Sequence, residues 1–557
     1  MFRATDLIRM PSSLHSAILS TVFFGSFSVA FAQQPAYVGS QACSGCHAGI
    51  YRSFSKTDMG KSMQSADALK PGLVPAEATI PAPGGQSLRV YRDATGWHQM
   101  ESVPGVFEDD HKLDYVVGSG ANGLSFIVHR GSYLFQAPLS FYSKTGQWDL
   151  SPGYENVDVA FGRTIAQECV LCHSGRPEPV VDRVGKYADP PFRELAIGCE
   201  NCHGPGSAHI NRPKAPGVIV NPAKLAPRVA EEICTNCHQG GDAKVLQPGK
   251  TYRDFHPGQW LLDTVAIFKK APFGQEKEAD LLEHNAAMKL SRCFRESGGK
   301  LSCLTCHDPH VQIPPAESSA YFQQKCLTCH TQNSCTAPLA ARERQSPPND
   351  CLACHMPKRA IAKISHSALT NHRIPARPDE PLPLADAPTD DTGLILVNPS
   401  TPPRHLSGIT LLQAYSQLVN NNALYQQKYL DLLARLSRDE AGDPYVQAAL
   451  GHKKLAEGKN EEALISLTPA LRLENATVES DVAQALTNLG RPQEALPHWE
   501  AAAQIDAYNP VILKTLTLQY IQLHKYAEAE RQMRSYVENF PEDTFMRNLL
   551  ARVQKEH

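Results

Sequence analysis

One pentapeptide pattern, Cys-x-x-Cys-His, occurs seven times in the 557-residue chain and constrains it more than any other feature. The pattern is the attachment signature of a c-type haem. Its two thiols bond the porphyrin vinyl groups, and the histidine that follows lies under the iron as the proximal ligand. A zinc site or a redox dithiol would explain the cysteine pairs, but not a histidine directly after every pair. The sequence therefore predicts seven covalently bound haems.

Each motif supplies two cysteines and one proximal histidine, and we number the sites 1 to 7 in chain order. The predicted haem cysteines are Cys43, Cys46, Cys169, Cys172, Cys199, Cys202, Cys234, Cys237, Cys303, Cys306, Cys326, Cys329, Cys351 and Cys354. The predicted proximal ligands are His47, His173, His203, His238, His307, His330 and His355. An isolated first motif is thus followed by two triplets, at 169–238 and 303–355.

The sixth position of each iron needs a ligand unless it is open to a small molecule. His310 lies three residues beyond a proximal histidine. His209 follows Gly204-Pro-Gly206, whose glycines let the backbone approach a flat macrocycle, and it is expected to serve a neighbouring haem. His284 lies on a helix predicted over 278–293. The predicted distal histidines are His209, His284, His310, His366 and His372.

Met59 is the sixth predicted distal ligand, because a thioether can ligate haem iron and raise its reduction potential. Met63 would share its helix face if the helix predicted from Ala48 continued that far. Packing is the alternative for both methionines. The histidines that we rank lower are His98, His111, His129 and His256. Six ligands leave one of seven irons unassigned, and that iron is either closed by a lower-ranked ligand or open.

The N-terminus has the pattern of a secretory signal peptide, predicted over residues 1–32. Arg3 and Arg9 are positive, an apolar stretch spans 17–27, and Ala30-Phe-Ala32 matches a cleavage site. The apolar stretch is short for a bilayer span, and an uncleaved anchor is the alternative. Because c-type haems are attached outside the bacterial inner membrane, we expect a periplasmic or extracellular protein.

Export also bears on the two cysteines outside the motifs, Cys293 and Cys335. In an oxidising compartment a disulfide is the usual state of two spare cysteines. A thiolate that faces a haem is the alternative for Cys293.

The mature chain divides into a haem-rich part and a part without cysteines. A heptahaem domain with little regular structure is predicted over 33–374, and a small antiparallel sheet is predicted inside it at 87–150, where β-rich runs alternate with glycines. Proline-rich residues 375–403 are predicted to form a linker, and residues 404–557 are predicted to be helical. The expected fold class is therefore mainly α.

The helical part contains an internal repeat. Gly458-x4-Ala463, Gly490-x4-Ala495 and His524-x4-Ala529 follow one another at offsets of 32 and 34 residues. A period of 34 residues is typical of the tetratricopeptide repeat, which consists of helix pairs. A generic helical bundle is the alternative. Repeats of this kind stack into a concave surface, so we expect this domain to bind a protein partner.

Three segments resemble the multihaem cytochromes related to the tetrahaem cytochrome of ammonia oxidisers and, more distantly, to hydroxylamine oxidoreductase and cytochrome c nitrite reductase. These segments are 43–59, 199–209 and 303–310, and the resemblance covers about 37–372. It implies a similar haem arrangement. In that family a histidine often stands at the place of Met59 and ligates a haem, which puts the identity of this ligand in question.

The resemblance does not transfer a reaction. The nitrite reductases use a lysine in place of one proximal histidine, and no Cys-x-x-Cys-Lys occurs here. The hydroxylamine oxidases crosslink a tyrosine to the catalytic haem, and no tyrosine here can be matched to it.

The sequence favours an exported heptahaem electron carrier with a repeat domain for a redox partner protein. The alternative is an oxidoreductase that acts on a small nitrogen or sulfur compound at one open iron, and a third reading makes the repeats an assembly scaffold. With a net charge of −3 and no basic run, nucleic acid is not an expected partner.

Overall fold

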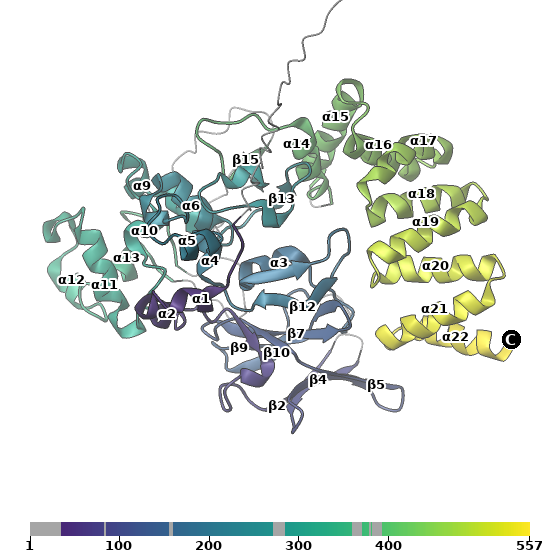
Figure 1. The fold of residues 1–557 in the computed structure, drawn as a ribbon, viewed down its shortest axis with the longest axis horizontal. Coiled ribbons are helices and arrows are strands. Elements are labelled where there is room, and N and C mark those ends of the chain that lie inside the picture. Colours follow the sequence, from purple (N-terminus) through teal and green to yellow (C-terminus); the bar gives the residue numbers. More distant parts are fainter. Residues whose placement is uncertain are drawn as a thin grey trace, which may run out of the picture.

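The computed structural model describes residues 35–82, 85–154, 160–270, 284–358, 370–377, 380, 393–420 and 422–556. The predicted signal peptide and His366 lie outside these residues. The described chain has three regions: a haem lobe that carries the seven motifs, a sheet region between sites 1 and 2, and a helical region at the C-terminal end (Figure 1).

The sheet region contains ten strands in two antiparallel sheets. The six-stranded sheet has the order β1-β6-β7-β9-β10 with β8 on β7, where the strands are β1 (Met63–Ser65), β6 (Tyr115–Val117), β7 (Gly123–Arg130), β8 (Tyr133–Gln136), β9 (Leu139–Tyr142) and β10 (Gln147–Leu150). The four-stranded sheet is β2 (Glu77–Pro81), β3 (Ser87–Arg92), β4 (Trp97–Val103) and β5 (Phe107–Lys112). The core of the sheet region is formed by alternating buried positions of the strands and by the buried rings of Trp97, Phe126 and Phe135.

The antiparallel sheet was expected, but it is larger than predicted and begins earlier. Helix α2 (Ala48–Phe54) stops where the Thr57 N–H and hydroxyl both donate to the Phe54 carbonyl. The helix predicted to reach Met63 therefore ends nine residues short, and Met63 begins strand β1. Its side chain is 2% exposed in an apolar cluster with Ile127 and Leu134. Met63 is thus a packing residue.

The haem lobe consists of short helices joined by turns and one hairpin. The helices are α1 (Ser40–Ser44), α2, α3 (Gln167–His173), α4 (Cys199–His203), α5 (Ser207–Asn211), α6 (Pro227–Thr235), α8 (His284–Leu290), α9 (Arg292–Glu296), α10 (Cys303–Cys306), α11 (Pro315–Leu327), α12 (Leu339–Glu343) and α13 (Cys351–His355). Strands β11 (Arg176–Pro179) and β12 (Tyr187–Glu194) form the hairpin. The helix predicted over 278–293 is interrupted, because Ser291 ends α8 and caps α9 with its hydroxyl.

A three-stranded sheet lies at the edge of the haem lobe and corrects the predicted linker. Its strands are β13 (Ala243–Leu246), β14 (Val265–Lys270) and β15 (Leu394–Leu396). β15 lies inside the proline-rich stretch 375–403, in a run that is free of proline. The Asn398 carboxamide accepts from the Ile267 N–H and donates to the Val265 carbonyl, so this end of the stretch is bound to β14.

The helical region contains three helix pairs in series between flanking helices. Its helices are α14 (Gly408–Ser416), α15 (Ala423–Asp439), α16 (Pro444–Ala456), α17 (Asn460–Ala470), α18 (Ala476–Asn488), α19 (Pro492–Ile505), α20 (Pro510–Gln522), α21 (Tyr526–Asn539) and α22 (Thr544–Glu556). Helices α16, α18 and α20 begin at the predicted spacing, each after an N-cap Asp443, Asn475 or Asn509. The repeat alanines Ala463, Ala495 and Ala529 are fully buried, so small side chains permit close helix packing.

The helical region contacts the rest of the molecule at two places. Near its start, Leu412, Tyr415 and Tyr425 pack on the β13–β15 sheet in one apolar cluster. Between α19 and α20, the Tyr508 ring lies 4.8 Å from Tyr133 and 4.7 Å from Phe135 in the sheet region. The helices therefore line one side of the molecule as a docked element (Figure 1).

Among the described residues, helices account for 44% and strands for 17%. The expectation of a mainly α fold with one small inserted sheet therefore holds only in part, because the described chain contains several sheets. Within the described residues, no helix combines the length and apolarity needed to cross a bilayer.

Candidate haem centres

Each attachment motif forms about one helical turn. In sites 1, 4, 5 and 6 the histidine N–H donates to the carbonyl of the first cysteine, at distances of 2.7–2.9 Å. Residues three and four apart lie on the same side of such a turn. Local backbone structure thus presents two thiols and one imidazole in the same direction, as covalent attachment of a haem above that imidazole requires.

Four proximal histidines face a second histidine from another part of the chain. The ring centres are 6.2 Å apart for His47–His209, 6.1 Å for His203–His310, 6.0 Å for His238–His284 and 6.2 Å for His307–His372. Two imidazoles on one metal, with metal–nitrogen bonds of about 2.0–2.1 Å as for zinc, have centres roughly 6 Å apart. The spacing and donor chemistry therefore fit a bis-histidine iron at sites 1, 3, 4 and 5.

Hydrogen bonds orient several of these rings. The Nδ1 atoms of His203, His355 and His372 lie 2.8, 2.8 and 2.9 Å from the backbone carbonyls of Val220, Pro375 and Thr370. An Nδ1–H that donates to a carbonyl leaves Nε2 free for a metal. Burial also lowers the pKa of His203, His284 and His372, to about 3 for His284, so these rings are neutral at pH 7, the form that can ligate a metal.

The remaining three proximal histidines belong to sites 2, 6 and 7. Within the described part of the chain, no second histidine ring faces His330 or His355. His366, one of the predicted distal ligands, is outside that part. Met59 lies in the turn after α2, where the Asp58 N–H donates to Gln312 and brings the turn beside the segment of His310.

Two of the lower-ranked histidines of the sheet region lie beside carboxylates. His98 lies on β4, with its Nδ1 3.3 Å from Asp110, and its ring stacks on Tyr91. On β5, His111 lies 2.7 Å from Asp109.

Thiols of different motifs lie close together, which orders the sites in space. Hydrogen-bonded pairs are Cys43–Cys199 (sites 1 and 3), Cys172–Cys237 (sites 2 and 4) and Cys234–Cys303 (sites 4 and 5). Electrostatic interactions also connect Cys202 with Cys237, Cys306 with Cys329 and Cys326 with Cys351. Sites 1-3-4-5-6-7 therefore form a continuous series, and site 2 adjoins site 4.

The two spare cysteines are not joined. Both thiols are free, and Cys335 is exposed, so the expected disulfide is absent from the structure. Cys293 interacts with Cys306 and Cys329, whereas Cys335 interacts with Cys351. The two cysteines thus belong to different neighbourhoods of the lobe.

A second observation fits haem at sites 5 to 7. None of residues 303–358, all of which the structure describes, is buried. A segment without an apolar core gains too little free energy from burial to offset the conformational entropy that is lost when its backbone is ordered. Three macrocycles would supply the apolar contact that its side chains lack.

Sequence reasoning missed a carboxylate that joins sites 1 and 3. Glu200 stands between the cysteines of site 3 and is 5% exposed. Its oxygens accept from the backbone N–H groups of Val38, Gly39 and Gly206 at 2.7–3.0 Å. An acidic residue inside a haem motif was the available signal, but its three partners are set by the fold.

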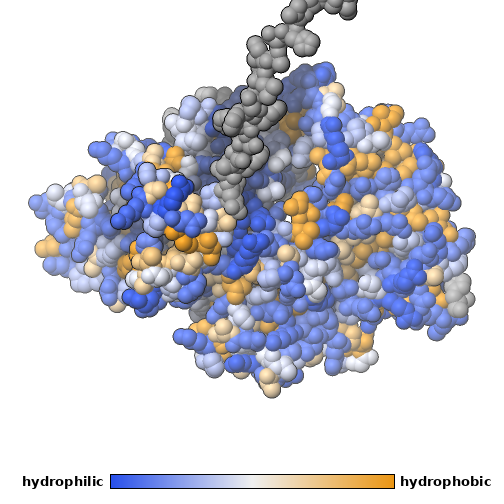
Figure 2. Space-filling view, viewed as in Figure 1, coloured by the Kyte–Doolittle hydropathy of each residue, from blue (hydrophilic) through white to orange (hydrophobic). Residues whose placement is uncertain are grey.

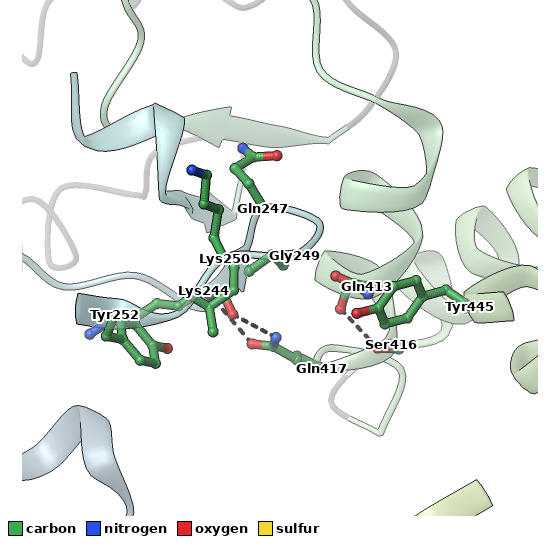
Figure 3. Close-up of a pocket in the computed structure, with 11 residues that line it drawn as sticks. Lys244, Gln247, Gly249, Lys250, Tyr252, Gln413, Ser416, Gln417 and Tyr445 are labelled. Atoms are coloured by element: carbon green, nitrogen blue, oxygen red, sulfur yellow. Dashed lines mark hydrogen bonds between the residues drawn. The ribbon is translucent and has the colours of Figure 1, made fainter. Parts of the chain in front are cut away.

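One cavity of about 390 Å³ lies between the haem lobe and the helical region. β13 and the turn after it supply Lys244, Lys250 and Tyr252, and α14 and α16 supply Gln413, Gln417 and Tyr445 (Figure 3). The Gln417 side chain bonds both the N–H and the carbonyl of Lys244, which holds the walls together. Burial, Glu168 and Cys172 raise the pKa of Tyr252 to about 12, so this end adjoins site 2.

We compared the chain with known proteins. No known protein family matches it. A C-type polyheme cytochrome, OmcC, of Geobacter sulfurreducens is 25% identical over 172 residues, which are 29% of this chain and 20% of the cytochrome. The chain therefore spans about a fifth of the length of this curated relative.

Solved structures also resemble part of the chain. A TPR protein with an unusual peptide-binding site, YrrB, is 16% identical with a TM-score of 0.24, over 27% of this chain and 77% of its own. The first TPR of Spaghetti (RPAP3), bound to an HSP90 peptide, is 19% identical with a TM-score of 0.19, over 20% of this chain and 94% of its own. Part of the chain is thus similar in sequence to a polyhaem cytochrome, and its structural neighbours include tetratricopeptide repeat proteins.

Proposed function

We propose that this chain is an exported multihaem c-type cytochrome that carries electrons through seven covalently bound haems. The four histidine pairs at 6.0–6.2 Å carry this proposal. A motif is a local pattern, whereas each pair joins a motif to a histidine at least 46 residues away in the sequence. Such pairing has a simple explanation if each pair shares one iron.

The protein residues would hold each haem, ligate its iron and orient the ligand rings. Motif cysteines would anchor each haem, the paired histidines would hold its iron, and backbone carbonyls such as that of Val220 set the ring orientation. Bound haem would supply a one-electron couple between ferric and ferrous iron. The neighbouring thiols support a route along sites 1-3-4-5-6-7 with a branch to site 2.

Haem content and spin state test the proposal. The mature protein should gain the mass of seven haems, and at least four should be low-spin in the resting ferric state. The His209→Ala variant should convert one haem to high-spin, while the control His98→Ala leaves all spectra unchanged. If the measured mass of the protein equals that of the polypeptide alone, or if the spectra of His209→Ala are unchanged, the assignment is contradicted.

Met59 provides a separate test of the ligand set. If its thioether ligates an iron, one haem titrates well above the bis-histidine haems, because thioether ligation raises the potential. The Met59→His variant should then lower that one potential. Seven similarly low potentials in the unchanged protein would remove Met59 as a ligand.

An enzymatic role is the second candidate, favoured by the absence of a facing histidine ring at His330 and His355 among the described residues. An open iron could act on a small nitrogen or sulfur compound. In that case a high-spin ferric signal in the resting protein should change on addition of nitrite, hydroxylamine or sulfite. Entirely low-spin spectra count against this role.

We assign the helical region to binding of a redox partner protein. Exposed apolar side chains occur here, and Figure 2 shows apolar surface over these helices; among them Val511 is 70% and Leu518 48% exposed. The two residues are seven apart on α20 and therefore share one face. Such a face suits a protein partner better than solvent.

The double variant Val511→Asp, Leu518→Asp tests this assignment. Reduction of its haems by a periplasmic extract of the source cells should slow several-fold, while reduction by dithionite is unchanged. Ile465→Asp, on α17 and 74% exposed, is the matched control. Equal rates in all three proteins would exclude the α20 face as the docking surface.

A further inference from the structure

Two carboxylates are buried in the haem lobe where sites 4 and 5 meet. Glu231 and Glu232 lie on α6 and are 3% and 5% exposed. Charged side chains are rarely buried to this extent unless they are paired. The burial of such groups destabilises a fold unless neighbouring groups compensate their charge.

The neighbours compensate the two charges only in part. Glu232 accepts the Leu261 N–H at 3.0 Å. One oxygen of Glu231 lies 3.4 Å from the Arg228 guanidinium, and its other oxygen, Oε1, is buried without a hydrogen-bond partner among the described residues. A buried carboxylate with incomplete partners exchanges its charge for a proton more readily than an exposed one.

The charged groups that face this pair come from several elements. Arg228 lies on α6 itself. Lys289 lies on α8, where its ammonium donates to the Val397 carbonyl at 3.0 Å, and its charge faces both carboxylates. η2 (Pro222–Lys224) and η4 (Leu261–Asp263) also pack on α6, and there Lys224 is exposed while Asp263 pairs with Arg404.

The position of the pair relative to the haem sites is defined by the helices. Helix α6 carries the first cysteine of site 4, Cys234, in its last turn, and α8 begins with His284, which faces the proximal His238 of that site. The Cys303 thiol of site 5 has its pKa raised by contact with Cys234, by burial, and by the charges of Cys234 and Glu231. The charge of Glu231 therefore acts on the cysteines of both attachment sites, Cys234 and Cys303.

We propose that Glu232, supported by Glu231 and Lys289, takes up a proton when sites 4 and 5 accept an electron. The inference rests on the proposed electron-carrying function. One electron from the redox partner converts ferric to ferrous iron, and one proton from solvent converts the carboxylate to a carboxylic acid. The total charge of the buried region is then unchanged, which lowers the electrostatic cost of each electron in a medium of low dielectric constant.

The titration range of the carboxylate suits this role. Burial raises the pKa of Glu232 to about 7, and burial also raises the pKa of Glu231. An added electron nearby raises the carboxylate pKa further. Below its pKa in the oxidised protein Glu232 is already protonated, so uptake on reduction begins only as the pH rises above about that value.

Spectroelectrochemical titration of the haem-loaded protein between pH 5.5 and 8.5 tests the proposal. The midpoint potential assigned to sites 4 and 5 should be flat at low pH and fall at higher pH. The limit is about 59 mV per pH unit, the one-electron equivalent of a tenfold change in proton activity. Glu232→Gln should abolish the slope, and Glu296→Gln, an exposed glutamate on α9, should retain it.

Two further measurements keep the test decisive if Glu232→Gln loads haem poorly. Lys289→Met removes a positive charge, raises the carboxylate pKa and should move the onset of the slope to higher pH. In the unaltered protein, an infrared difference spectrum should show loss of a carboxylate band and gain of a carboxylic acid band on reduction. A pH-independent potential, an unchanged slope in Glu232→Gln or no carboxylate signal overturns the proposal, whereas haems that cannot be reversibly reduced overturn the electron-carrying function itself.

Discussion

The two triplets contain the same number of haem motifs, but only the first has buried side chains of its own. The first, at 169–238, is built on side chains: Val170, inside the site 2 motif, packs in one buried cluster with Tyr187 and Phe192. The second, at 303–355, contains no buried residue at all. One triplet is therefore attached to a protein core, whereas the other has no core of its own, and the proposed haems would complete one.

The largest expected effect comes from preventing attachment. Replacement of Cys326, Cys329, Cys351 and Cys354 by serine removes sites 6 and 7, and we expect residues 303–358 to lose their protease resistance entirely while the sheet and helical regions keep theirs. Cys169→Ser with Cys172→Ser should leave the first triplet resistant, because Val170, Tyr187 and Phe192 still pack. Limited proteolysis with mass spectrometry compares the two; equal cleavage of both triplets contradicts the distinction.

Removal of one core side chain from the first triplet should have a smaller effect than the loss of sites 6 and 7, but it should still lower the stability substantially. Phe192 is 6% exposed and its ring lies 5.2 Å from Tyr115. Phe192→Ala should lower the free energy of unfolding by about 3–5 kcal/mol, the range for a buried aromatic residue. Leu339→Ala, at a 55% exposed position in the second triplet, should change it by less than about 0.5 kcal/mol. Denaturant titration measures both, and similar values would remove the contrast.

A smaller loss is expected from Glu200→Gln, which keeps the volume but removes the charge that three backbone N–H groups share. Hydrogen bonds to a charged group contribute about 1.5–3 kcal/mol. The variant should loosen the segment around Val38 and site 1 and leave sites 5 to 7 unaffected. Hydrogen exchange at Gly39 and Gly206 reports this directly, and unchanged exchange would show that the carboxylate does not hold the segment.

The smallest effect on stability is expected for replacement of one distal histidine, His310, which should change the spectrum of a single haem. His310 lies in the second triplet but faces His203 of the first, so it connects the two. His310→Ala should convert one haem to high-spin with little change in the melting temperature. His256→Ala is the matched control outside the facing pairs. Electron paramagnetic resonance of both variants decides whether the link passes through an iron.

Much of the candidate site could be predicted, because its signals are local. A one-turn motif needs only neighbouring residues, and the glycines before His209 and the short spacing before His310 are equally local. Buried repeat alanines such as Ala463 and Ala495 follow from a period that the helix itself imposes. His98 was ranked low because it lies in a β-rich run, and in the structure it lies on strand β4 beside Asp110.

Other features could not be predicted, because partners distant in sequence decide them. Met63 has helical spacing from Met59, but pairing with Val117 places it on a strand. Residues 394–396 follow many prolines, yet β14 offers them an open edge. Cys293 and Cys335 were expected to pair, and the lobe places them beside different haem cysteines.

By itself, then, the sequence predicted the cofactor chemistry, the proximal ligands and the repeat, since each prediction depends on covalent order or on the period of one helix. The tertiary structure alone decided which histidine faces which motif, that sites 4 and 5 meet over buried Glu231 and Glu232, and that the helices dock on the sheet through Tyr508. These depend on how segments separated by tens to hundreds of residues bury their surfaces against one another, and no local pattern records that.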